Sequence, residues 1–161
     1  MKIKWLSAHK DILVEGGSLS GLVGEHLMRK LADEVPVGEL DKRIVSVEQI
    51  AFVAPIFRWA WNGFHFLNLV HEADIRLENR SNVWVISARF YFTELAVLCF
   101  VFTSLPGLAM AQHLIPQALV LFALVWVVFF IGGVFLALGL FERWVEKTQS
   151  AFIVKQLAKR I

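Results

Sequence analysis

One run of the sequence limits the fold more than any other feature. Ala118 to Phe141 holds 24 residues without a single ionisable side chain, and about 20 such residues are enough for a helix to cross a bilayer. The whole chain is 57% hydrophobic, which is more than a soluble domain of 161 residues usually carries. This run is therefore predicted to be a transmembrane helix.

A second apolar run, Phe90 to Met110, precedes the first and would be about 31 Å long as a helix. Its single charge, Glu94, lies one turn from the start, where the carboxylate can reach the interface. An interfacial anchor is the favoured interpretation of Glu94, and an ion-handling group is the alternative. Because the connection 111–117 is short, the two runs predict an antiparallel transmembrane hairpin with spans at about 90–110 and 118–141.

Basic residues flank this hairpin on one side only. Arginines precede the first span, lysines and arginines follow the second, and the connecting loop contains neither. The positive-inside rule then predicts a protein integral to the cytoplasmic (inner) membrane with both termini in the cytoplasm. No cleavable secretory signal is expected, because His9, Lys10 and Asp11 follow the basic start before an apolar core of the required length can form.

Small residues gather in the second half of the longer run. Gly133 and Ala137 are four residues apart, a spacing that lets another helix backbone approach closely. The alternative is that glycine is simply common in membrane helices. The predicted helix-packing positions are Gly132, Gly133, Ala137 and Gly139.

The tail 142–161 repeats apolar residues at helical period with basic residues on its other faces. It is predicted to be a basic amphipathic helix that lies on anionic headgroups or, alternatively, packs on a partner. Membrane-interface positions are predicted in this tail, at the start of the run Phe90 to Met110, and in the aromatic stretch 51–70. They are Trp59, Trp61, Arg89, Glu94, Trp144, Lys147, Lys155 and Lys159.

Residues 1–89 are predicted to form a cytoplasmic juxtamembrane α+β region. Apolar residues recur at three- and four-residue steps from Leu19 to Val35, which indicates a short amphipathic helix that ends before Pro36. Alternating apolar and charged residues over 72–92, broken by the polar turn Asn79 to Asn82, indicate a β-hairpin close to the bilayer surface. The predicted class is thus membrane α+β, with a helix and a short antiparallel sheet, a two-helix hairpin and an amphipathic C-terminal helix.

The stretch Ala51 to Val70 is apolar and rich in aromatic residues, so it could be read as a third span. Against that, Arg58 near its middle costs roughly 2.5–3.5 kcal/mol on an insertion scale. A strand pair or an interfacial segment, with Trp59 and Trp61 at headgroup level, is the favoured interpretation.

No pattern in the sequence demands catalysis or a cofactor. The five histidines lack the spacing of a zinc helix, the single Cys99 lies in an apolar run, and no serine stands in a G-x-S-x-G elbow. Up to Arg89, eleven basic residues offset eleven acidic ones, which disfavours nucleic acid as a partner. No metal or cofactor is predicted; contact with lipid or a pigment has no specific support.

These features predict a non-catalytic accessory or scaffold subunit of a larger inner-membrane complex, with other membrane subunits and lipid as partners. The alternative is a membrane-anchored regulatory or effector protein whose cytoplasmic region senses a ligand, which is compatible with a homo-oligomer. A small channel or transporter is less favoured, because only Glu94 is charged within the spans.

Overall fold

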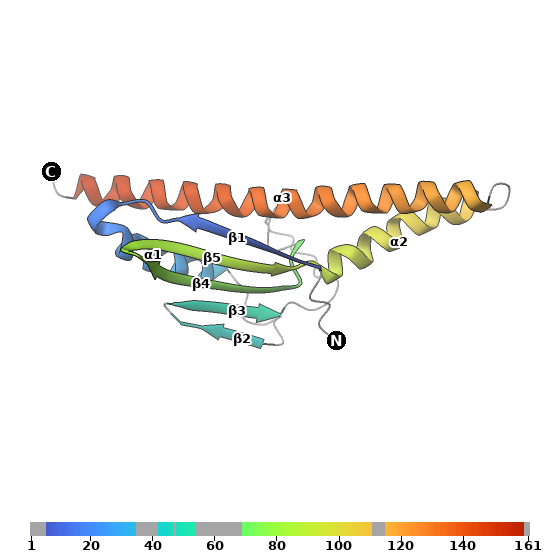
Figure 1. Ribbon diagram of the computed structural model, residues 1–161. Coiled ribbons are helices and arrows are strands. Elements are labelled where there is room, and N and C mark those ends of the chain that lie inside the picture. The colour runs from blue at the N-terminus through green and yellow to red at the C-terminus, as the bar shows by residue number, and fades with distance from the viewer. Residues whose placement is uncertain (1–5, 35–41, 47, 54–68, 111–114, 160–161) are drawn as a thin grey trace.

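The computed structural model describes residues 6–34, 42–46, 48–53, 69–110 and 115–159 (Figure 1). They form an antiparallel sheet, one helix that covers one face of it, and two further helices, of which the longer packs its C-terminal half on the sheet and the first helix. The elements are β1 (Ser7–Leu13), α1 (Ser20–Glu34), β2 (Lys42–Val45), β3 (Gln49–Val53), β4 (Glu72–Arg80), β5 (Val83–Tyr91), α2 (Thr93–Met110) and α3 (Ile115–Ala158).

The five strands are ordered β1-β5-β4-β3-β2, and every neighbouring pair is antiparallel. The β-hairpin predicted over 72–92 is confirmed as β4 and β5, in which Arg80 pairs with Val83. Ser81 and Asn82 connect them with positive φ angles of 53° and 67°, and such a two-residue turn matches the twist of the strands it joins.

The helix predicted from Leu19 to Val35 is confirmed as α1, which a short 3-10 turn at Gly17–Leu19 precedes. Its apolar side, which includes Leu27 and Leu31, packs in one core with inward residues of the sheet such as Ile50 and Ile75. The approach is close at Gly24, where an added Cβ would lie 2.7 Å from Cδ1 of Leu77. The small α+β region thus has one covered face and one open face.

The most extended element is α3, whose 44 residues span about 66 Å at roughly 1.5 Å per residue. Of the described helices, α3 alone is long and apolar enough to cross a membrane, and only 6% of its most apolar window is buried. Phe129 and Phe135 are 65% and 71% exposed. A core helix of a soluble protein would bury this surface, so the apolar part of α3 indicates association with a membrane.

The other predicted span, Phe90 to Met110, corresponds to a less decisive element in the structure. Helix α2 is 18 residues long, and its described apolar stretch, Leu95–Ser104, is too short to count as a span by itself. The predicted pair of crossings is therefore reduced to one candidate span, although α2 runs back along α3 in the opposite direction (Figure 1).

Side chains hold α2 against the apolar half of α3. An added Cβ at Gly133 would lie 2.8 Å from Cδ2 of Leu95, so the missing side chain lets the helices approach. The indole N–H of Trp126 donates to the carbonyl of Ala96 at 3.1 Å. In α2, Thr103 donates its hydroxyl hydrogen to the carbonyl of Cys99 at 2.6 Å, which satisfies a polar group on an apolar helix.

The structure differs from the expected separate tail, because α3 continues without a break from the apolar run to Ala158. Its C-terminal half lies alongside the α+β region (Figure 1). Phe141 and Val145 are fully buried, and the ring of Phe141 meets that of Phe90 edge-on at 5.0 Å. The tail is thus only partly buried against the same chain, because Val145 packs in the core whereas Leu157 is 53% exposed.

Sequence patterns did not predict strands β1 and β2, and β3 overlaps only the first residues of the stretch Ala51 to Val70, for which a strand pair was one interpretation. In β1, Lys10 occupies an inward position between Ala8 and Ile12, and its ammonium donates to Glu142 of α3 at 3.0 Å. That long-range ion pair replaces the apolar residue that a strand pattern would require. Residues 54–68, which include most of the stretch Ala51 to Val70, lie outside the described residues.

Candidate functional site

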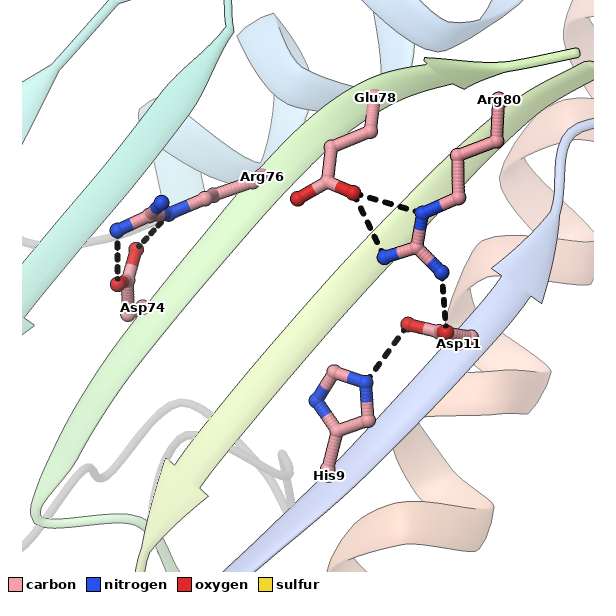
Figure 2. Close-up of polar contacts among 6 residues, drawn as sticks. All are labelled: His9, Asp11, Asp74, Arg76, Glu78 and Arg80. Carbon is pink, nitrogen blue, oxygen red and sulfur yellow. Dashed lines mark hydrogen bonds and ion pairs between the residues drawn. The ribbon is translucent and has the colours of Figure 1, made fainter.

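The open face of the sheet carries a cluster of charged side chains. Along β4, four residues of alternating sign point to this face because side chains on a strand alternate between its two sides. They are Asp74, Arg76, Glu78 and Arg80. Figure 2 shows that Arg80 meets Asp11 of β1, whose neighbour is His9, while Asp74 and Arg76 pair with each other. β1 lies on the far side of β5 from β4.

One group of contacts is centred on the guanidinium of Arg80. Its Nη2 lies 2.6 Å from Glu78 Oε2, and its Nη1 lies 2.8 Å from Asp11 Oδ2. The other oxygen of Asp11 lies 3.0 Å from Nε2 of His9. Two carboxylates therefore share one guanidinium, which leaves this group with one excess negative charge when His9 is neutral.

The other group joins Arg76 to Asp74 through two contacts. Nη2 of Arg76 lies 2.9 Å from Oδ2 of Asp74, and its Nε donates to Oδ1 at 3.2 Å. The side-chain amide of Gln49 also donates to Oδ1, at 2.9 Å. This group is electrically balanced.

Both aspartates of the face are held in the ionised form. Partial burial acts to raise the pKa of Asp11, but hydrogen bonds from Ser87 and Arg80 outweigh it and the pKa is lowered. Burial also acts to raise the pKa of Asp74. Hydrogen bonds from Arg76 and Gln49 outweigh that effect, so the pKa of Asp74 is lowered as well. The carboxylates therefore remain charged at neutral pH.

Between the two groups lies a hollow of about 310 Å³, here called the polar hollow. Arg89 of β5 also lines it, and its cross-strand neighbours are His9 and Asp74. Within the described residues, Arg89 makes no hydrogen bond or ion pair of its own, although its charge acts on Asp74 from a distance. The lining residues are His9, Asp74, Arg76, Glu78, Arg80, Ser87 and Arg89.

A second, apolar hollow of about 250 Å³ lies between the start of β1, the residue that precedes α2, and the apolar half of α3. Ser7 is its one polar lining residue, and the others are Leu6, Phe92, Phe130, Ile131, Val134 and Phe135. The backbone N–H of Phe92 donates to the carbonyl of Leu6 at 2.9 Å, which fixes the start of β1 beside the start of α2.

The predicted helix-packing residues do not share one environment. Gly133 faces Leu95 of α2, and Ala137 is buried in the core. An added Cβ at Gly132 or at Gly139 would meet nothing within 4 Å. Gly133 and Ala137 therefore lie on the inner side of α3, while Gly132 and Gly139 lie on its uncovered side.

The predicted membrane-interface residues are dispersed. The indole N–H of Trp144 donates to Oε2 of Glu34 in α1 at 2.8 Å, so it is held on the α+β region. Lys147, Lys155 and Lys159 are exposed along the end of α3. Arg89 lines the polar hollow, Glu94 lies in the first turn of α2, and Trp59 and Trp61 lie outside the described residues.

A further feature that sequence patterns did not predict is the seam between α1 and the end of α3. The ring of His26 stacks on that of Phe152 with centroids 4.2 Å apart. Thr148 and Gln149 are buried nearby along α3, and Oε1 of Gln149 has no hydrogen-bond partner among the residues that the structure describes. Polar groups buried in this way make a seam less stable than an apolar one.

Acidification is expected to destabilise this seam. Burial, and then the charges of Lys30, Lys155 and Arg29, lower the pKa of His26 from its ordinary 6.5. The folded protein thus disfavours protonation, so its stability is full above pH 6.5 and falls as the pH drops below that value. Denaturant unfolding at pH 7.5 and 5.5 should show this loss, and a His26→Phe variant should lose less. An equal loss in both proteins would contradict the role of His26.

Within the described residues, no three His, Cys, Asp or Glu side chains gather in a group that could hold a metal ion. No family model, no curated protein and no solved structure matches the chain. The geometry of the open face and of the long helix is therefore what bears on function.

Proposed function

We propose that this protein is a non-catalytic scaffold subunit of a larger inner-membrane complex. In this proposal α2 and the apolar half of α3 cross the bilayer as a pair. The α+β region sits on the cytoplasmic surface and presents its open, charged face to partners. Both termini lie in the cytoplasm.

The observation that carries the proposal is that one helix belongs to two environments. The apolar half of α3 exposes residues such as Val128 and Phe135, while Phe141 and Val145 of the same helix are buried against the sheet. Half of a 66 Å helix is roughly the thickness of a hydrocarbon core. Lipid and neighbouring subunits would cover the exposed half, and the packed half would fix the α+β region beside the bilayer.

The change in side-chain chemistry along α3 supports the same placement. The first charged residues of its described part are Glu142 and Arg143, directly after the apolar run. Glu142 forms an ion pair with Lys10 of β1, so the first charged residue of α3 already contacts the sheet. Lys155 and Lys159 would then point into the cytoplasm, about 18 Å and about 24 Å beyond Arg143 along the helix axis.

A regulatory or effector function is the second candidate, and the unbroken course of α3 favours it. A stiff helix that is buried in the α+β region at one end and apolar at the other would transmit a shift of that region into the membrane. In that case the seam between His26 and Phe152 would be a place at which the docked helix could move.

Native co-purification in a mild detergent, followed by mass spectrometry, distinguishes these functions. A scaffold subunit should be recovered with a constant set of other membrane proteins in a particle much heavier than 18.3 kDa. A monodisperse particle that contains only copies of this chain would contradict the scaffold proposal and favour the effector.

A further inference from the structure

We infer that the polar hollow binds the headgroup of a lipid that carries a phosphate and a primary ammonium, as phosphatidylethanolamine does. The inference rests on the proposed placement of α2 and α3 in the membrane, and it goes further by naming a ligand for the charged face. The hollow has about 310 Å³ of space, and its floor and walls come from three adjacent strands, β1, β5 and β4.

The charges of the hollow are arranged as a dipole. Arg89 has no carboxylate of its own within the described residues, so its end of the hollow is positive. At the other end Arg80 is shared by Glu78, which lines the hollow, and by Asp11, which lies beside it on β1, so the two carboxylates make that end negative. A ligand with one negative and one positive group matches both ends, whereas a simple anion matches only the first.

The positive end of the hollow lies nearer to the proposed bilayer than its negative end. A lipid headgroup has the matching order, because its phosphate lies nearer to the acyl chains than its ammonium. β5 runs directly into α2, and Arg89 stands four residues before Thr93, about 13 Å along a strand. Asp11 pairs with Ser87, two residues further from the bilayer than Arg89. The phosphate, which is nearer the acyl chains, would lie at Arg89, and the ammonium would lie further out at the carboxylates.

Hydrogen-bonding capacity adds a preference for a primary ammonium. The guanidinium of Arg89 offers donors in a planar fork that fits phosphate oxygens. Glu78 uses Oε2 for Arg80, and its Oε1 remains available to accept a hydrogen bond. An ammonium has three N–H donors, and the quaternary amine of a choline headgroup has none, so ethanolamine should be preferred.

The ligand chemistry can be tested without a membrane. The full chain, purified in detergent, would be titrated calorimetrically with O-phosphoethanolamine and with inorganic phosphate. We expect tighter binding of phosphoethanolamine, and about fivefold weaker binding of it to an Arg89→Gln variant, as for one exposed charge pair. Glu78→Gln should reduce the preference over phosphate. Arg29→Gln, which removes an exposed arginine on α1, is the charge-matched control and should bind normally.

A second measurement tests whether the bound phosphoethanolamine group belongs to a lipid or to a soluble molecule. The protein in nanodiscs of mixed phosphatidylethanolamine, phosphatidylglycerol and phosphatidylcholine should retain the first lipid selectively, and Arg89→Gln should lose that selectivity. Binding of soluble phosphoethanolamine without lipid selectivity would overturn the lipid assignment. Equal binding of phosphate and phosphoethanolamine, or normal binding by Arg89→Gln, would overturn the site itself. Failure of the membrane placement would show separately, as a protein recovered without detergent.

Discussion

Replacing Phe141 with alanine is expected to lower the free energy of unfolding by about 3–5 kcal/mol, the range typical of a large aromatic residue removed from a core. The side chain is fully buried, meets Phe90 edge-on at 5.0 Å, and stacks on Trp144 with ring centroids 6.5 Å apart. Its loss leaves a cavity where α3 packs on the sheet. Guanidinium unfolding in detergent micelles, followed by circular dichroism, measures the change.

The matched control for this prediction is Phe135→Ala, on the same helix. Phe135 is 71% exposed, so its removal should change the stability of the isolated chain in detergent by less than about 1 kcal/mol. If the two variants unfolded at the same denaturant concentration, Phe141 would not be the anchor of α3 on the α+β region.

Substitution of Gly133 by leucine is expected to separate α2 from α3 at a cost of about 1–3 kcal/mol, the usual range for overpacking. Already the first added atom would lie 2.8 Å from Cδ2 of Leu95 and 3.1 Å from its Cδ1. The variant should also weaken recovery of any complex that depends on the helix pair. Spin labels at one exposed position on each helix, such as Val101 and Leu124, would report the separation directly.

Gly132→Leu is the control for this second prediction, because the adjacent glycine differs only in what faces it. An added Cβ there meets nothing within 4 Å, so the distance between the labels should stay as in the parent protein. A longer distance in both variants would mean that leucine disturbs the helix itself, and the contact with Leu95 would then lose its assigned role. Loss of a complex in Gly132→Leu alone would instead place a partner on the uncovered side of α3.

The elements predicted from sequence are those whose patterns are local. The amphipathic period of α1, the alternation in β4 and β5, and the polar turn at Ser81 and Asn82 are visible without tertiary contacts. The apolar run of α3 is recognised in the same way, because its length and its lack of charge are properties of the segment alone.

The elements that were missed depend on contacts between distant residues. β1 includes Lys10, which is tolerated at an inward position only because Glu142 lies beside it, 132 residues further along the chain. The tail was expected to lie on headgroups, since its basic faces suit a membrane surface equally well. Only the apolar surface of the sheet around Phe90 shows that the first part of the tail, at Val145, packs within the chain.

The charged face could be read only in part from the sequence. The alternation of Asp74, Arg76, Glu78 and Arg80 is plain along β4. The strand order places β1 on the other side of β5 from β4, and the sequence pattern of β4 does not reveal this order. The order brings His9 and Asp11 to the same face of the sheet. Arg89 was predicted to lie at the membrane interface, and this stays a prediction. Its place in the lining of the polar hollow follows from the pairing of β5 with both neighbouring strands.

Cysteine accessibility in intact spheroplasts tests the central claim most directly, namely that two helices cross the bilayer and leave both chain ends inside. The native Cys99 would be replaced by alanine, and single cysteines would be placed at Gln112, in the connection between the helices, and at Lys155, at the exposed end of α3. A membrane-impermeant maleimide should label Gln112→Cys in intact spheroplasts, and should label Lys155→Cys only after permeabilisation. Labelling of Lys155→Cys from outside, or protection of Gln112→Cys until permeabilisation, would contradict the proposed topology.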